Sequence, residues 1–401
     1  EVHRSIGLQV VFGSSVMMIM GASLVYPVLP VVAVALDIPI SQIGLVLTAF
    51  TLPAIFLAPI GGMLMDLRGR KQVLVFGLLL YGVAGMLISF APSLQWVLAL
   101  RAVQGIGYAA IMPLVVVIIG DMFSKEKETI AQGMKVVLDR ITLLVLPAAA
   151  GILAGIAWQA PFLLYGLAIP LGLAAARYLP EPLIERRAHA PGYIRDVLSA
   201  SFHLRSVTIF SMSSLRFFIE MSFFVYLPIF AIDKLNMTVS RGGLLFTVFA
   251  VGAILTAVTV GSITRRFERI PLVIVSFILQ GACLLAASFA DSVWAVGIVM
   301  LGFGLANGII SPAQKSLMTQ SVTGSLRGGF VAVDRVAQNT AKSLAPPIAG
   351  TIVAFTSIET MFQAMGALAI GWALTVMALE LAGMIAPPVQ QAKAHLTDAD
   401  R

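Results

Sequence analysis

Two apolar runs, residues 38–65 and 72–100, contain no charged residue and are joined by a loop of only a few residues. Each run exceeds the roughly 20 residues that a helix needs to cross a bilayer. The loop contains Arg68, Arg70 and Lys71, and short loops rich in lysine and arginine stay on the cytoplasmic side of a membrane. The sequence therefore predicts a tight hairpin of two membrane helices whose connection faces the cytoplasm.

The composition of the whole chain fits a protein whose surface faces lipid. Hydrophobic residues make up 59% of the chain and charged residues only 11%, with a mean hydropathy of +0.97, whereas soluble domains carry about 25% charge. The net charge of +7 reflects cations at predicted helix ends on one side, which indicates membrane topology and not nucleic-acid binding. The single cysteine, Cys283, excludes a disulfide framework.

Apolar segments of spanning length recur along the whole chain. The first, from Ser5 to Leu36, is too long for the core of a signal peptide and is predicted to span. Cations at the predicted cytoplasmic ends far outnumber those on the opposite side, where only Lys234 and Arg241 lie, so both termini are expected inside the cell. We predict twelve membrane helices, at about 6–32, 42–65, 72–91, 95–120, 133–155, 160–179, 207–232, 241–264, 270–290, 293–318, 329–353 and 359–385.

The chain repeats itself at an offset of 199 residues. Gly62 and Arg70 have counterparts in Gly261 and Arg269, and Pro147 has one in Pro346. The longest polar interruption, residues 181–205, falls at the midpoint. The sequence predicts an all-α membrane protein with two pseudo-symmetric six-helix halves, residues 1–190 with a cytoplasmic linker to about 205, and residues 206–401 with a short cytoplasmic tail.

Two motifs point to a known family. Residues 62–71 read G-x-L-x-D-x-x-G-R-K, and Arg101–Gly107 reads R-x-x-Q-G-x-G. Both resemble signatures of the major facilitator superfamily of transporters, the first in the loop between helices 2 and 3 and the second in helix 4. The resemblance implies a conformational latch at the cytoplasmic side, formed here by Gly62, Asp66, Gly69, Arg70, Lys71 and Asp121.

The same resemblance implies a role in proton transfer for Arg101. The alternative is a structural arginine bound to backbone carbonyls. Helix 5 also resembles the superfamily's antiporter motif, but only in part: Gly133, Pro147 and Gly151 are kept, whereas Thr142, Leu146 and Ala150 replace expected glycines. This erosion weakens the argument for antiport without excluding it.

Several ionisable residues fall at predicted membrane depth. Because lipid does not tolerate them, they are expected to line a hydrated cavity, although neighbouring opposite charges could simply neutralise each other. The proton-coupling candidates are Glu220, preferred for its depth, Asp139, Asp334 and Arg101. The candidate substrate contacts are Tyr26, Gln104, Tyr108, Arg140, Arg216, Tyr226, Asn307, Lys315, Arg335 and Lys342. Cations outnumber anions in this set, which favours anionic, zwitterionic or neutral substrates over lipophilic cations.

These residues predict a secondary transporter of the plasma membrane that works by alternating access. The resemblance is to the drug:proton antiporter branch, which implies proton-coupled efflux of a drug or metabolite by a monomer. The alternatives are a facilitator or flippase for an anionic, sugar-like or lipid substrate and, less favoured, a transport-inactive sensor or scaffold. No phosphate-binding G-x-x-x-x-G-K-[ST] loop is present, and the four histidines lie in the tails or the mid-loop. An ATP-driven pump, an enzyme, a metal site and a cofactor are therefore not expected.

Overall fold

A computed structural model describes residues 6–123, 125–179, 193–266, 268–320 and 327–385. Every regular element in these ranges is a helix. Eleven of the described helices are long and apolar enough to cross a membrane. The remaining predicted helix, at 329–353, forms as well, as α15 (Arg327–Phe355), but Asp334, Arg335 and Lys342 make it less apolar than the others. The chain therefore has the predicted all-α fold.

The first six spans form one bundle, and four of them contain more than one helical element. The elements are α1 (Ile6–Ser23), η2 (Tyr26–Val28) and α2 (Leu29–Ala35); α3 (Ile40–Ile43) and α4 (Leu45–Arg68); α5 (Arg70–Leu87) and η3 (Ile88–Phe90); α6 (Leu94–Met122); α7 (Lys125–Ile156); and α8 (Ala160–Leu163), η4 (Leu164–Leu167) and α9 (Ala168–Tyr178). The first span breaks where Pro27 and Pro30 remove backbone donors, as a proline inside a helix does.

The remaining spans form the second bundle. They are α11 (Leu204–Leu235), α12 (Val239–Arg266), α13 (Arg269–Ser288), α14 (Val293–Gln320), α15 and α16 (Ile358–Leu381). A short helix, α10 (Tyr193–Ser201), lies within the predicted linker, and the part of the linker before it lies outside the described residues.

Most predicted helix boundaries agree with the structure to within a few residues. The fifth is wrong at its start, because α7 begins at Lys125 and not at residue 133. The prediction began each span at the edge of an apolar run, whereas Lys125, Glu126 and Lys127 continue the helix beyond it. Lysine and glutamate are good helix formers, so a polar turn extends the helix.

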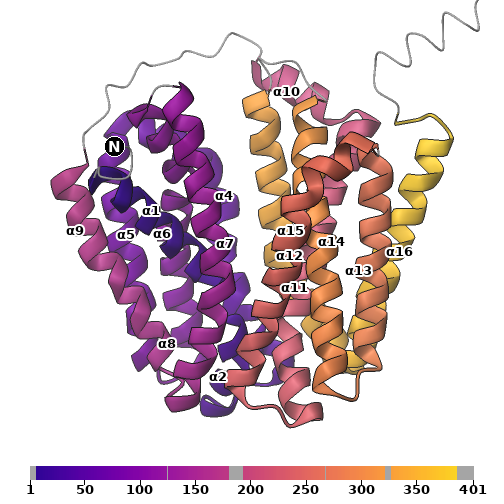
Figure 1. The fold of residues 1–401 in the computed structure, drawn as a ribbon. Helices are drawn as coiled ribbons and strands as arrows, with labels where there is room; N and C mark the ends of the chain where they lie inside the picture. Colours follow the sequence, from indigo (N-terminus) through magenta and orange to yellow (C-terminus); the bar gives the residue numbers. More distant parts are fainter. Residues whose placement is uncertain (1–5, 124, 180–192, 267, 321–326, 386–401) are drawn as a thin grey trace, which may run out of the picture.

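The two bundles lie side by side and approach each other at one end (Figure 1). We call the end near the last residue of α9 and the first of α10 the linker face, and the opposite end, where α2 and α8 lie, the far face. The internal repeat is visible in the packing: a Cβ on Gly105 would lie 2.2 Å from the carbonyl oxygen of Phe50, and one on Gly304 would lie 2.2 Å from that of Phe249. These two close approaches are related by the 199-residue offset.

Candidate functional site

A cavity of about 410 Å³ opens within the second bundle, between α11, α14 and α15. Arg216 and Lys342 line it near the middle of their helices, and Asp334 and Arg335 line it nearer the start of α15. Its lining continues to Met318 and Val331, which lie near the linker-face ends of α14 and α15. The cavity therefore runs from the middle of the bundle toward the linker face, and it has the size of a site for a drug-like molecule.

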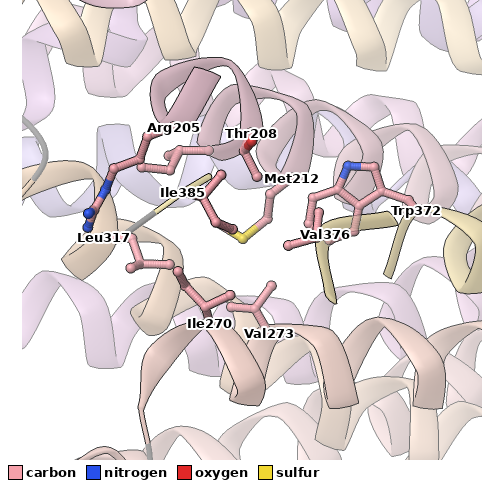
Figure 2. Close-up of a pocket in the computed structure, with 10 residues that line it drawn as sticks. Arg205, Thr208, Met212, Ile270, Val273, Leu317, Trp372, Val376 and Ile385 are labelled. Carbon is pink, nitrogen blue, oxygen red and sulfur yellow. The ribbon is translucent and has the colours of Figure 1, made fainter. Parts of the chain in front are cut away.

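A second pocket lies between α11, α13, α14 and α16, where Arg205 and Leu317 mark one side and Trp372 and Val376 the other (Figure 2). Its volume is only about 20 Å³, which is room for little more than one water molecule. The cavity beside Lys342 is therefore the candidate site.

Glu220 lies in the middle of α11, one turn from Arg216. Its Oε2 accepts a hydrogen bond of 2.8 Å from the Asn307 amide on α14, and the same oxygen is 3.9 Å from Arg216 Nε. The carboxylate is mostly buried, with its side chain 15% exposed. Glu220 thus connects α11 to α14 beside the cavity, and Asn307 holds it in place.

Arg216 and Lys342 share one aromatic neighbour, Phe217. The Arg216 guanidinium carbon lies 4.4 Å from the ring centroid and Lys342 Nζ lies 4.0 Å from it, which are cation–π distances. Within the described residues, Lys342 makes no hydrogen bond and no ion pair. Among the described side chains, the hydrogen-bond contact of Arg335 is with Met112 Sδ across the bundles, at 3.9 Å. Lys342 and Arg335 therefore face the cavity without a bound carboxylate.

The other two carboxylates differ in their surroundings. Asp334 is 2% exposed; Gln338 donates to its Oδ2 at 2.6 Å, and the Ser213 hydroxyl lies near the same carboxylate. Asp139 pairs with Lys135 one turn earlier at 2.6 Å and accepts a 2.5 Å hydrogen bond from Ser15 on α1. Asp139 is therefore held inside the first bundle.

Arg101 is fully buried in the first bundle. Its Nη1 donates to the Gly21 carbonyl at 3.1 Å and to Gln104 Oε1 at 2.6 Å, and its guanidinium lies 4.9 Å from the Phe50 ring centroid. The carbonyls of Met20 and Gly21 also accept from the Tyr165 hydroxyl. Gly21 lies in the last turn of α1, where helix carbonyls lack backbone donors, so this cluster stabilises the end of α1. These contacts fit the alternative interpretation of Arg101, a structural arginine bound to backbone carbonyls.

The predicted latch lies at the linker face. Arg70 forms an ion pair with Asp121, as expected from the motif. Gly69 has φ +88°, a conformation that favours glycine and that lets α5 begin directly after α4. Lys71 follows in the first turn of α5 and Gly62 lies in α4, whereas the Asp66 side chain lies outside the described residues.

The remaining predicted contacts are dispersed. Tyr108 packs against Phe50 with ring centroids 4.8 Å apart. The Tyr26 hydroxyl donates to Met221 Sδ at 3.2 Å, so Tyr26 joins the two bundles and is not part of the cavity lining. Tyr226 is fully buried, with its hydroxyl close to Gly350. Arg140 lies near enough to Arg216 for the two charges to interact. The Lys315 side chain lies outside the described part of the chain.

Two equivalent hydrogen bonds join the bundles on the far-face side of the cavity. Thr48 on α4 donates to the Ser343 carbonyl on α15 at 2.9 Å, and Thr247 on α12 donates to the Leu144 carbonyl on α7 at 2.8 Å. Residues 48 and 247, and residues 144 and 343, are each related by the 199-residue offset. We call these two contacts the clasps.

Close backbone packing accompanies each clasp. A Cβ on Gly44 would lie 2.7 Å from Pro346 Cβ, and one on Gly243 would lie 2.5 Å from the Pro147 carbonyl oxygen. Glycine at these two positions lets the helices approach closely, and the positions again differ by 199 residues. The contact between the bundles near the far face is therefore formed twice, by helices that the internal repeat relates.

The architecture, the cavity and the repeat agree with what a family comparison finds. The sequence profile described as Major Facilitator Superfamily matches residues 11–242 and 209–397. The chain belongs to the Major Facilitator Superfamily. It is a multi-pass membrane transporter.

Relatives of this superfamily member include exporters. The chain is 25% identical over 381 residues to Multidrug resistance protein 1 of Bacillus subtilis (strain 168), covering 93% of this chain and 96% of that protein. It is 34% identical over 152 residues to the Bacillibactin exporter of the same organism, covering 36% of this chain and only 38% of that protein. The fold is similar to that of a point mutant of the nucleoside transporter NupG, with a TM-score of 0.79 at 13% identity, covering 94% of this chain and all of that one.

Several residues of the site were missed by the sequence reasoning. Lys135 stands four residues before Asp139, and this i,i+4 spacing could have identified the pair. Ser15, Tyr165 and Phe217 carry no comparable signal. Their roles depend on contacts between helices far apart in the sequence, or on a ring that lies between two cations.

Proposed function

We propose that this superfamily member is a proton-coupled exporter of the plasma membrane that moves small molecules by alternating access. The linker face would be the cytoplasmic side, as the excess of cations there predicts. The cavity, which runs toward that face, would then be open to the cytoplasm in this conformation. Substrate would enter beside Lys342 and leave after the clasps at the far face open.

The observation that carries the coupling proposal is the position of Glu220. Its carboxylate lies at mid-membrane depth beside the cavity, bonded to Asn307 and 3.9 Å from Arg216. A buried carboxylate is costly when it is charged and weakly paired. Rocking of α11 against α14 would alter the contact with Asn307, and a proton could then bind or leave.

Asp139 is a weaker candidate in this account. Lys135 and Ser15 both hold it at hydrogen-bond distance, so it has two partners that stabilise its charge.

Export as the direction of transport is supported by the names of the two relatives described above, a multidrug resistance protein and an exporter. We therefore place the proton on Glu220 and the latch at Arg70 and Asp121.

Flux through the purified protein in proteoliposomes tests this proposal. A panel of anionic, neutral and cationic aromatic compounds is offered with and without an imposed proton gradient, at matched protein content. We expect at least one class to be concentrated against its gradient, and this accumulation should collapse when an ionophore dissipates the proton gradient. Accumulation that survives the ionophore, or no flux for any class, would contradict the proposal.

A further inference from the structure

The cavity between α11, α14 and α15 contains more positive charge than its own residues neutralise. Arg216, Arg335 and Lys342 line it, and Arg140 of the first bundle lies near enough to Arg216 for the two charges to interact. Among the described side chains at this site, the carboxylates that oppose them are Glu220 and Asp334. Asp139 is already bound to Lys135, so it does not offset these cations.

The excess is concentrated on two residues. Among the described side chains, Lys342 has an aromatic ring 4.0 Å away and makes no hydrogen bond to an anion. The hydrogen-bond contact of Arg335, an exposed residue, is with a methionine sulfur. Arg216 is 8% exposed, and its Nε lacks a hydrogen bond. A cation at membrane depth costs several kcal/mol unless an anion or water stabilises it. A cavity lined by such cations is suited to a ligand that supplies negative charge.

The rest of the lining favours an apolar body on that ligand. Phe217, Met318 and Val331 face the same cavity, and the volume of about 410 Å³ exceeds what a small inorganic anion needs. Gln314 and Gln338 add amide groups to the wall, although Gln338 already donates to Asp334.

We infer that the substrate is an organic anion with an aromatic or apolar body, whose carboxylate-like group binds Lys342 and Arg335 while its body packs beside Phe217. This inference rests on the proposed function, because it names the substrate class of the proposed transport site. Asp334, next to Arg335, would disfavour a second negative charge close to it. A singly charged carboxylate is therefore the preferred ligand.

The test measures binding, separately from transport, by calorimetry on the purified protein. Naphthoate, salicylate and phenylbutyrate are each compared with the amide and the amine of the same skeleton. We expect at least one carboxylate to bind tenfold or more tightly than its matched amide and amine. This is the ratio of affinities that a hydrogen bond to a charged group typically contributes. In Lys342→Gln or Arg335→Gln this preference should fall to threefold or less. Lys234→Gln is the matched control, because Lys234 pairs with Glu359 in an exposed position, and it should keep the preference.

Thermal stability of the unliganded protein provides an independent readout. Lys342→Gln removes a cation that has no anionic partner, so the melting temperature should stay the same or rise. A clear fall would assign Lys342 a structural role and overturn the inference, as would amines that bind as tightly as carboxylates. Carboxylate binding that depends on Lys342 without any flux would refute the proposed transport and leave this inference intact. Flux of amines without a carboxylate preference would support the proposed transport and refute this inference.

Discussion

Thr48→Val removes the hydroxyl that joins α4 to α15 while keeping a side chain of nearly the same shape. The Ser343 carbonyl that accepts this hydrogen bond lies four residues before Pro347, which has no N–H to donate to it. Thr48 therefore supplies the donor that the helix cannot. Without it, a buried carbonyl stays unpaired in the conformation with a closed far face, whereas water reaches it when that face opens.

The size of the conformational shift depends on whether the carbonyl at each clasp keeps another hydrogen-bond donor. Leaving a buried acceptor unpaired costs about 1–3 kcal/mol, which shifts the equilibrium toward the open far face by about 5- to 150-fold. Thr247→Val should shift it less, because Leu144 can still accept from the backbone N–H of Ala148 in the next turn. The loss there is an ordinary hydrogen bond of about 0.5–1.5 kcal/mol.

Pulsed electron paramagnetic resonance between spin labels on the two bundles measures this shift. Phe90 and Trp294, 72% and 84% exposed, are suitable label positions in a Cys283→Ser background, since Cys283 is the only native cysteine. The long-distance population should increase in the order wild type, Thr247→Val, Thr48→Val. Thr259→Val is the control, because its hydroxyl bonds within its own helix. The reasoning fails if Thr48→Val matches this control or if Thr247→Val has the larger effect.

Three further predictions concern the charged residues. Arg101→Ala should lower the free energy of unfolding by about 2–4 kcal/mol, because it removes the hydrogen bonds to the Gly21 carbonyl and to Gln104 and leaves a cavity. Arg101→Lys should restore little of this in chemical denaturation, since lysine lacks the guanidinium fork. Asp66→Asn should slow flux at a normal protein level, and normal flux would exclude it from the latch. Asp139→Asn should retain gradient-driven accumulation in proteoliposomes, because Lys135 and Ser15 hold this carboxylate; loss of coupling there would move the proton site to Asp139.

The sequence predicts the helices and the repeat well, for a clear physical reason. Membrane spans are continuous apolar runs, and the 199-residue offset preserves the glycines and prolines at which helices pack most closely. Gly105 and Gly304 each lie against a backbone carbonyl, so a larger residue would disturb the packing. Such positions are recognisable in a single chain because only small residues fit them.

The partners of the charged residues are less predictable. Adjacent residues such as Asp139 and Arg140 point in different directions on a helix, so the sequence pairing of acid and base did not identify the ion pair that forms with Lys135. The Arg216–Glu220 contact was predictable, because residues four apart share a helix face. Contacts such as that of Ser15 with Asp139, or of Asn307 with Glu220, depend on how separate helices are rotated, which no local pattern encodes.

Glu220→Gln tests the central claim most directly when two kinds of transport are measured on the same proteoliposomes. Exchange of labelled for unlabelled substrate at equal pH requires binding and alternating access but no net proton movement. Accumulation driven by an imposed proton gradient requires the coupling carboxylate as well. We predict that Glu220→Gln keeps the exchange, since glutamine can still accept the hydrogen bond from Asn307, and loses the gradient-driven accumulation. Accumulation by Glu220→Gln at the wild-type level would contradict the account and leave Glu220 a structural residue.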